Sequence, residues 1–412
     1  MSFGDAMKTR VRLAPLGITV FSALLAGAAH GQVRFVVSDL GPLPDFPDSQ
    51  ANAINNSGTI AGYSQNSTQI TAVYWDGAAT PTALESLSNA SGTRATAISA
   101  SDSIVGYSTL TSASQIVVAT LWAAGEPAEG LGTLSGGLRS GALWINSVDE
   151  IVGYSDESGS NGKVHAIRWT REAGMRSLGT LAGDYESEAL GINNGGAIVG
   201  YSRGAFTTAF LWSDTTGMVS LGTLGGITSQ AYSINDAGVI VGYSTTSSGT
   251  GRGFLWTSAA GMVALPSAAQ TFAYRINRVG LIVGLADYGF GDLRAVLWTP
   301  GGATTHELND LQQSGSPFIR LMTAYSVNDR GWIVGYGELA SSPGDYHAFL
   351  AQPTATCPGD LNLDFMIDLS DLATLLSHFG STGTYTEGDL DHDGKIDLAD
   401  LAQLLSLYGL TC

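Results

Sequence analysis

Several residue types that catalysis and nucleic-acid binding depend on are scarce in this sequence. Its 412 residues include only 18 Lys and Arg against 36 Asp and Glu, so the formal net charge is −18. Nucleic acid is therefore not an expected partner, because its binding requires a basic surface. Neither His-Glu-x-x-His nor a glycine-rich phosphate loop occurs. After residue 31, no apolar run is long enough to span a bilayer.

Residues 1–31 have the pattern of a secretory signal peptide. A basic stretch ending at Arg12 precedes the apolar run 13–29, and Ala-His-Gly at 29–31 is a small-x-small cleavage site. Cleavage there would start the mature chain at Gln32. An uncleaved anchor helix is the alternative. We expect a protein that is secreted or held at the cell surface, with no membrane span after cleavage.

Glycine is abundant, with 54 residues, and it marks an internal repeat. The pattern Ile-Asn-x-x-Gly-x-Ile-Val-Gly-Tyr-Ser, seen most clearly at 233–244, occurs seven times, and the copy at 97–108 is degraded. The glycine before the tyrosine lies at Gly62, Gly106, Gly153, Gly200, Gly242, Gly284 and Gly335, with Leu285 replacing the tyrosine in the sixth copy. The intervals of 42 to 51 residues between these glycines are typical of repeat proteins.

Each copy predicts a β-hairpin. Asn235 can cap its own turn through an Asx hydrogen bond, and Gly238 supplies a position with positive φ. The β-branched run 239–241 then predicts a strand with both faces covered. A strand ending in tryptophan follows, as at Trp212, and a closing strand such as 218–224 completes the unit. Four strands in about 45 residues are the size of a propeller blade.

The two ends of the repeat region complement each other. Residues 34–43 resemble a closing strand without the rest of a repeat, whereas the seventh repeat ends after residue 350 without one. A closed ring explains both facts, because the N-terminal strand then completes the last blade and no sheet edge stays free. We predict an all-β, seven-bladed β-propeller of four-stranded repeats over residues 32–352; six or eight blades are the alternatives.

The repeat resembles the HAF repeats of bacterial extracellular proteins. The resemblance covers about 50–350 and rests on the Ile-Asn…Gly-Tyr-Ser pattern, on Leu-Gly-Thr-Leu-Gly-Gly at 221–226 and on His-Ala-Phe at 347–349. It implies an extracellular protein without a defined activity.

The repeats offer few candidates for chemistry, and we predict no catalytic or cofactor-binding residue in them. One acidic cluster could hide a carboxylate pair for sugar hydrolysis, although solvated loop charge is the favoured explanation; its members are Asp156, Glu157, Asp184, Glu186 and Glu188. Recurrent Trp and Tyr predict blade packing, and Gly242 with its equivalents predicts close backbone approach between crowded blades. The variable loops 156–163 and 245–252 are the expected place for a glycan or protein ligand.

The composition changes after the linker 353–356. Residues 357–412 hold ten Asp and Glu against Lys395 alone, and they are a duplication with an offset of 29 residues. In each half, side-chain oxygens recur at loop positions 1, 3, 5, 9 and 12, the spacing of an EF-hand calcium loop. An apolar helical stripe follows each loop and ends before Gly380 and Gly409.

This loop–helix duplication resembles a type I dockerin domain. The resemblance implies two Ca²⁺ ions and a cohesin-like or cell-surface protein as partner. The implied ligands are Asp360, Asn362, Asp364, Met366 through its carbonyl, Asp368 and Asp371 in the first loop, and Asp389, Asp391, Asp393, Lys395 through its carbonyl, Asp397 and Asp400 in the second. Cys357 and Cys412 predict a disulfide in an exported protein, with two free thiols as the alternative.

Together these features predict four segments: a signal peptide at 1–31, a propeller at 32–352, a linker at 353–356 and a dockerin-like calcium-binding domain at 357–412. The expected function is a secreted binding or display scaffold anchored through its C-terminal domain, and the dockerin resemblance implies an extracellular polysaccharide-degrading assembly as its setting. The alternatives are a polysaccharide-active enzyme with a divergent catalytic propeller and a C-terminal domain that serves only as a structural cap.

Overall fold

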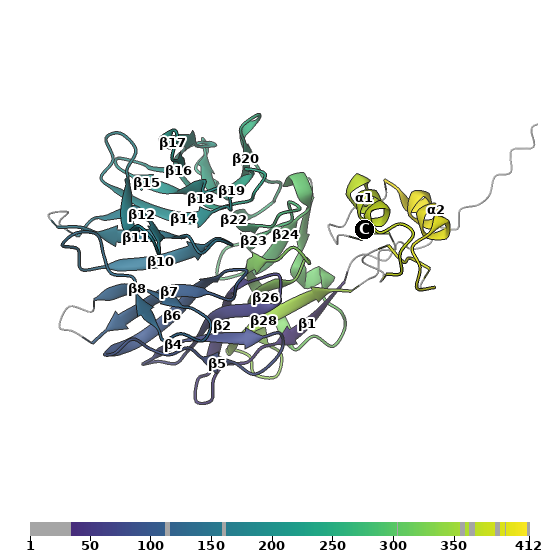
Figure 1. Cartoon of the computed structure of the whole chain (residues 1–412), viewed down its shortest axis with the longest axis horizontal. Coiled ribbons are helices and arrows are strands. Elements are labelled where there is room, and N and C mark those ends of the chain that lie inside the picture. The colour runs from purple at the N-terminus through teal and green to yellow at the C-terminus, as the bar shows by residue number, and fades with distance from the viewer. Residues whose placement is uncertain are drawn as a thin grey trace, which may run out of the picture.

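The structure of the chain is a computed structural model. It describes residues 34–111, 116–158, 162–302, 304–354, 359–361, 367–383, 388–391 and 393–409. The segment 1–31 and both cysteines lie outside these residues. Strands follow one another from residue 35 to residue 353, and two short helices lie beyond them (Figure 1). The predicted all-β repeat region with a helical C-terminal part is therefore confirmed.

The strands pair in consecutive antiparallel groups of four. Four groups form separate sheets: β2 (Asp48–Ile54) with β3 (Thr59–Gln65), β4 (Ile70–Asp76) and β5 (Thr82–Ala83); β6 (Ala90–Ile98) with β7 (Ile104–Leu110), β8 (Val117–Trp122) and β9 (Glu129–Gly130); β10 (Ser140–Ile145) with β11 (Ile151–Asp156), β12 (Val164–Thr170) and β13 (Gly174–Gly179); and β22 (Gln270–Ile276) with β23 (Ile282–Asp287), β24 (Leu293–Trp298) and β25 (Thr305–Glu307). Each group contains one copy of the repeat, as predicted.

A larger, eight-stranded sheet holds two further groups of four. They are β14 (Glu186–Ile192), β15 (Ile198–Arg203), β16 (Thr207–Ser213) and β17 (Gly217–Gly222), then β18 (Gly225–Ile234), β19 (Ile240–Thr246), β20 (Gly251–Thr257) and β21 (Gly261–Ala264). A parallel pairing of Thr207 with Thr228 joins the two groups. Two 3₁₀ turns, Pro300–Gly302 and Leu308–Leu311, lie between β24 and β26 and flank β25.

The N-terminal strand completes the last sheet. β26 (Phe318–Val327), β27 (Ile333–Leu339) and β28 (Tyr346–Pro353) are consecutive in the chain, and β1 (Phe35–Asp39) is the fourth strand, antiparallel to β28. Figure 1 shows the purple β1 beside the yellow-green β28. Phe35 is fully buried in this sheet's core. The surplus strand at one end of the repeats therefore fills the deficit at the other, as predicted.

Hydroxyl groups connect neighbouring groups of four strands at six of the seven junctions; in the last group Met322 stands at the equivalent position. The Ser or Thr near the start of the first strand accepts a hydrogen bond from a backbone N–H in the third strand of the preceding sheet. The pairs, at 2.8–2.9 Å, are Ser49 with Ala348, Thr93 with Ala72, Ser140 with Ala119, Ser187 with Ala166, Ser229 with Ala209 and Thr271 with Gly253. The first pair joins the last sheet to the first, so the arrangement is a closed ring.

The repeated glycines have a different cause from the predicted one. A Cβ on Gly242 would collide with the carbonyl of Gln230 in β18, which belongs to the same sheet. A bulge between Ala231 and Ser233 brings this backbone close to Gly242. The prediction of close approach is confirmed, but its assignment to a neighbouring blade was wrong.

The recurrent tryptophans pack between sheets, as predicted. Trp75 and Trp298 are fully buried, and Trp122 is 4% exposed. Each of these indole N–H groups donates to a backbone carbonyl, Trp75 to Leu40 and Trp122 to Glu85, at 2.9 and 2.6 Å. Burying an aromatic ring while satisfying its N–H removes the main cost of placing tryptophan in a core.

The C-terminal part contains α1 (Leu369–Ser377) and α2 (Leu398–Leu407). Its small core includes equivalent residues from both halves: Leu361, Ile367, Leu375, Leu390, Ile396 and Leu404. The halves also exchange backbone hydrogen bonds, from Gly380 N to Ile396 O at 2.8 Å and from Gly409 N to Ile367 O at 2.7 Å. The two halves of the duplication therefore form one reciprocal unit.

Candidate functional site

The Ile-Asn turns of the repeats converge on one end of the ring. Each asparagine Nδ2 donates to the carbonyl of the equivalent residue in the next sheet. The links are Asn55 to Ser99 (3.0 Å), Asn146 to Asn193 (3.2 Å), Asn193 to Asn235 (3.1 Å), Asn235 to Asn277 (3.2 Å), Asn277 to Asn328 (3.0 Å) and Asn328 to Asn55 (2.9 Å). We call these six residues the asparagine ring.

The same side chains also cap their own turns. Asn235 Oδ1 accepts from Val239 N at 3.0 Å, and Gly238 has φ of 77°. This confirms the predicted Asx turn. The degraded repeat has Ser99 at this position, and its hydroxyl accepts from Ser101 N and Ser103 N at 3.2 Å each. Serine thus replaces the turn acceptor but is too short to reach Asn146.

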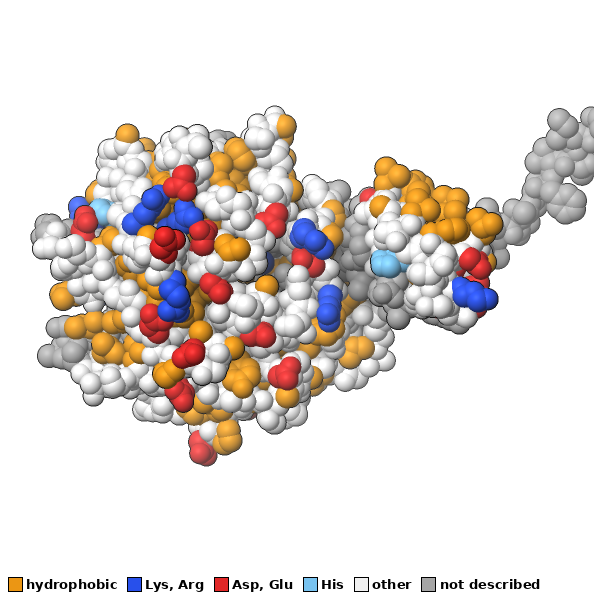
Figure 2. Space-filling model, in the orientation of Figure 1, with side chains coloured by type: hydrophobic (Ala, Val, Ile, Leu, Met, Phe, Trp, Pro, Cys, Tyr) orange, Lys and Arg blue, Asp and Glu red, His pale blue; other side chains and the backbone are white. Residues whose placement is uncertain are grey.

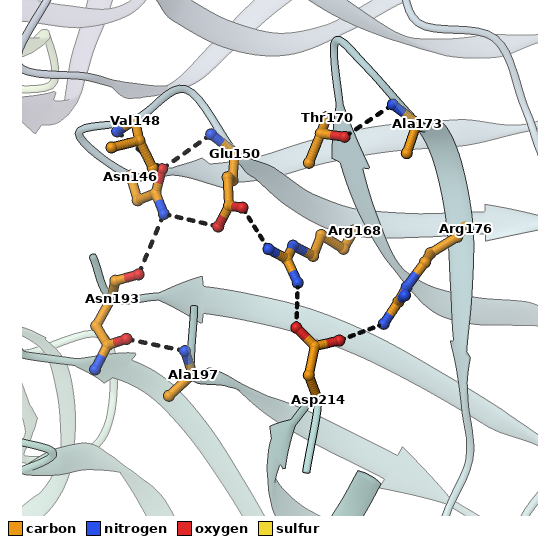
Figure 3. Close-up of polar contacts among 10 residues, drawn as sticks. All are labelled: Asn146, Val148, Glu150, Arg168, Thr170, Ala173, Arg176, Asn193, Ala197 and Asp214. Atoms are coloured by element: carbon orange, nitrogen blue, oxygen red, sulfur yellow. Dashed lines mark hydrogen bonds and ion pairs between the residues drawn. The ribbon is translucent and has the colours of Figure 1, made fainter. Parts of the chain in front are cut away.

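Charged residues reinforce one junction of the ring (Figure 3). Glu150 pairs with Arg168, and Arg168 reaches Asp214 of the next sheet at 3.0 Å. Asp214 also pairs with Arg176 at 2.8 Å. The hydrogen bond from Arg168 and the charge of Arg176 lower the pKa of the Asp214 carboxyl. We assign these charges to holding sheets together, since each has a partner of opposite sign.

An open cavity of about 360 Å³ is lined by the equivalent turns of all seven repeats. Two residues that precede the isoleucine in their turns meet here, Trp144 and Arg275. The guanidinium carbon of Arg275 lies 3.3 Å from the centre of a Trp144 ring. Its Nε is buried without a hydrogen-bond partner. Burial lowers the pKa of Arg275 to about 9.

Aromatic rings line the bulged first strands of three adjacent sheets. The ring centroids of Tyr232 and Tyr274 are 5.5 Å apart, and those of Tyr274 and Tyr325 are 5.4 Å apart. Burial raises the pKa of each hydroxyl, so these tyrosines stay neutral. They pack against one another across the boundaries between these sheets.

A larger groove, of about 830 Å³, lies between the first two sheets of the chain. Tyr74 contributes aromatic surface to it, Trp122 lies almost fully buried in its wall, and Asp76, Glu85 and Asp102 contribute carboxylates. Aromatic faces beside hydrogen-bonding oxygens are a chemically suitable lining for a sugar. The prediction of a ligand at loops 156–163 and 245–252 did not point to this groove.

The predicted acidic cluster is divided among separate partners. Asp156 accepts from the backbone N–H groups of Leu138 and Arg139, at 2.8 and 2.6 Å, and it is 6% exposed. Glu157 faces His165 at 3.4 Å. Such contacts fix loop geometry, so Asp156 is a structural residue.

Glu186 and Glu188 lie on the same face of β14, two residues apart. Glu186 pairs with Arg203 at 3.5 Å. Burial raises the pKa of Glu188, and a hydrogen bond with Tyr201 opposes this shift. Of the predicted acidic cluster, Glu186 and Glu188 are the two residues that could act as a pair of catalytic carboxyl groups.

The second acidic loop of the C-terminal part brings three predicted ligands together. Oxygens of Asp389, Asp391 and Asp393 lie within 4.8 Å of one another. Asp389 is 5% exposed; its Oδ2 accepts from Gly394 N at 3.1 Å, but its Oδ1 is buried and has no hydrogen-bond partner. Gly394 has φ of 84°, as predicted for the sharp turn of the loop.

The carboxylates predicted for positions 9 and 12 organise the helix starts. Asp397 caps α2 by accepting from Ala399 N at 2.8 Å, and Asp368 caps α1 through Ser370 N at the same distance. Asp400 is 1% exposed and accepts from Leu390 N at 2.7 Å and from Asp397 N at 2.8 Å. Asp371 repeats these bonds with Leu361 N and Asp368 N.

Burial raises the pKa of Asp400, but backbone N–H groups of Asp397, Asp391 and Leu390 outweigh this effect and lower it overall. The carboxylate therefore stays ionised and ties its loop to its helix. Lys395 donates its backbone N–H to Asp393 Oδ1 at 2.8 Å. Asp360 is 1% exposed, while Asn362, Asp364, Met366, Cys357 and Cys412 lie outside the described residues.

The second loop fits a calcium ion. A buried carboxylate oxygen without a donor costs free energy unless a cation or a water pairs with it. The neighbouring oxygens are carboxylates, and hard oxygen donors are the ligands that Ca²⁺ prefers. Asp389, Asp391 and Asp393 would hold the ion, whose charge would offset the repulsion among them.

No family model and no curated protein matches this sequence. Solved structures of similar fold exist. A puromycin hydrolase is 11% identical with a TM-score of 0.51, over 75% of this chain and 53% of the hydrolase. The propeller domain of the trilobed protease from Pyrococcus furiosus is 10% identical with a TM-score of 0.48, over 78% and 97%. TolB from Acinetobacter baumannii is 10% identical with a TM-score of 0.41, over 72% and 80%.

The four-stranded sheets, their ring closure and the likeness to the hydrolase establish a β-propeller. The chain spans about half of the length of that hydrolase. At these identities the likeness describes the fold alone. In the part of the chain that the structure describes, no helix is both long and apolar enough to cross a membrane.

Proposed function

We propose that the chain is a secreted, calcium-binding display or binding protein, in which a seven-bladed propeller is anchored through a dockerin-like domain. The observation that carries this proposal is the buried, unpartnered Oδ1 of Asp389 beside Asp391 and Asp393. The eight-stranded sheet counts as two blades, because its two groups of four each contain a complete repeat. Secretion rests on the signal-like segment at 1–31 and on the resemblance to HAF-repeat proteins.

Partner binding is supported by a duplicated apolar face on the C-terminal domain. Three pairs of equivalent residues are exposed to nearly the same degree: Leu369 (69%) and Leu398 (71%), Leu376 (51%) and Leu405 (52%), and Phe379 and Tyr408 (42% each). Figure 2 shows hydrophobic side chains gathered on one side of this domain. An apolar face repeated by a duplication fits one partner in two related orientations.

The apolar stripes predicted along the helices are therefore only partly core. Leu375 and Leu404 are fully buried, whereas Leu369, Leu376 and their equivalents face outward. The partner that we propose is an extracellular protein domain of the cohesin type. The propeller would be the displayed part, and the groove that contains Tyr74 and Trp122 would take its glycan.

A purified cohesin domain and the envelope fraction of the producing cells test this proposal. The full chain should bind one of them in Ca²⁺ and release it in EGTA. The single variants Leu369→Asp and Leu398→Asp should bind with little loss, because one half still presents the face, and the double variant should not bind. The proposal would be contradicted if binding persisted in EGTA, or if the double variant bound as tightly as the wild type.

A second candidate is a polysaccharide-active enzyme. The observation that favours it is Glu188, a carboxyl whose pKa burial raises, beside Glu186 on β14. If this pair acts, Glu188→Gln should abolish release of reducing sugar from a polysaccharide, while Asp184→Asn should not. Equal release by both variants would exclude the pair.

A further inference from the structure

We propose that the cavity at the asparagine-ring end of the propeller binds a small carboxylate through Arg275. This inference does not depend on the calcium-binding domain. The carboxylate would come from the end of a peptide or from a uronic acid, and the cavity of about 360 Å³ has room for one such unit.

The first argument is that no carboxylate neutralises Arg275. Arg168, Arg294 and Arg320 each contact two carboxylates. Among the described residues, Arg275 forms no ion pair. Its buried Nε has no hydrogen-bond partner, which is also true of Arg94, Arg168 and Arg320, but of these four arginines Arg275 is the one that lines the cavity. A partly buried guanidinium with free donors is costly unless something outside the chain pairs with it.

The second argument is the position of Arg275 in the repeat. The residue before the isoleucine is small in five copies, namely Ala53, Ala97, Gly191, Ser233 and Ser326. Only the third and sixth copies place large side chains here, and these two meet across the cavity. The indole face of Trp144 holds the guanidinium flat, because a cation over an aromatic ring is attracted to it. One edge of the guanidinium fork then remains for a planar anion.

The third argument is electrostatic. A chain with net charge −18 repels anions at most of its surface, so an anion site has to supply its own cation. At the cavity, Arg275 and Arg278 balance Asp236 and Asp329. Asp329 is engaged with Arg278 at 3.7 Å and Asp236 with Asn194 at 2.8 Å. Neither rim carboxylate forms an ion pair with Arg275, so its guanidinium remains available to an external anion.

The test uses the full chain and isothermal calorimetry. The probes are acetate, N-acetylglycine and galacturonate, each compared with a neutral match: acetamide, N-acetylglycinamide and galactose. At least one carboxylate should bind saturably, and its match should not. N-acetylglycine binding more tightly indicates a peptide terminus, and galacturonate binding more tightly indicates a uronic acid. Arg275→Met should weaken binding roughly tenfold or more, since it removes a bidentate charged contact.

Arg330→Met is the matched control, because Arg330 also stacks on a tryptophan, Trp332 at 5.4 Å, but lies on the exposed surface. It should bind as the wild type does. Arg275→Lys keeps the charge but loses the fork, so its affinity should lie between those of the wild type and Arg275→Met. If Arg275→Met does not fold, Arg275→Lys decides. The proposal would be overturned if the carboxylates and their neutral matches gave equal binding heats. It would also be overturned if the Arg275 variants bound as tightly as the wild type, and Arg275 would then serve only to fill space in the cavity.

Discussion

The Nδ1 atom of His347, on β28, lies 2.9 Å from a carboxylate oxygen of Asp39, the last residue of β1. This pair joins the two ends of the propeller across the strand pairing that closes the ring. It also gives the histidine of the His-Ala-Phe sequence a structural role. Burial alone would lower the pKa of His347, but the Asp39 carboxylate outweighs burial and raises it.

The closure should therefore depend on pH. A histidine whose pKa rises on folding stabilises the fold fully below its unfolded pKa of about 6.5, and this contribution is lost as pH rises through the higher folded value. The melting temperature of the wild type should exceed that of His347→Gln at pH 6, and the difference should shrink by pH 8.

His306→Gln is the control with the opposite sign. Burial lowers the pKa of His306, so this residue destabilises the fold as pH falls below about 6.5. The wild type should lose stability relative to His306→Gln at acid pH. A pH-independent difference for His347→Gln would show that the pair with Asp39 does not act through charge.

Removing the ring closure should destabilise the whole propeller. Phe35 is fully buried between β1 and its neighbours, so Phe35→Ala should cost about 3–5 kcal/mol of unfolding free energy. Val36→Ala, at a position that is 42% exposed on the same strand, should cost less than about 1 kcal/mol. Denaturant melts measure both. A chain that begins at residue 45 should also aggregate through its free strand edges. A monomeric truncation with an unchanged melt would argue against closure by β1.

The asparagine ring should be energetically measurable one link at a time. Asn235→Asp keeps the turn acceptor for Val239 N but removes the donor to Asn277 O, so it should cost about 1–3 kcal/mol. The converse change fills a gap: Ser99→Asn supplies the missing donor toward Asn146 and should gain about 0.5–1.5 kcal/mol. Thermal and denaturant melts would detect both changes. Destabilisation by Ser99→Asn would mean that the second repeat cannot accommodate the asparagine geometry.

Local patterns in the sequence predicted local structure well. The Asx turn at Asn235 and the glycine turn at Gly238 each depend on neighbours within a few residues. The ring closure was also predictable, because a surplus strand at one end and a missing strand at the other are both visible in the repeat pattern.

Relationships between repeats were not predictable in the same way. The donor role of Asn235 depends on how far the next sheet lies from its turn. Arg275 and Trp144 meet only because the ring brings the third and sixth repeats to the same cavity. The exposure of Leu369 and Leu398 also escaped prediction, since periodicity defines an apolar stripe but not how much of it a small domain can cover.

Calcium titration of the full chain by calorimetry tests the central claim most directly. We expect two sites, the tighter one in the second loop. Gly394 adopts the positive φ of the sharp turn without backbone strain, whereas the first loop has Phe365 at the equivalent position. Asp389→Asn should abolish the tighter site, and Asp45→Asn, at an exposed aspartate of the propeller, should leave both intact. Calcium at a hundred times the dissociation constant should stabilise the C-terminal domain by about 2.7 kcal/mol per site. No saturable calcium binding, or binding by Asp389→Asn equal to that of Asp45→Asn, would contradict the account.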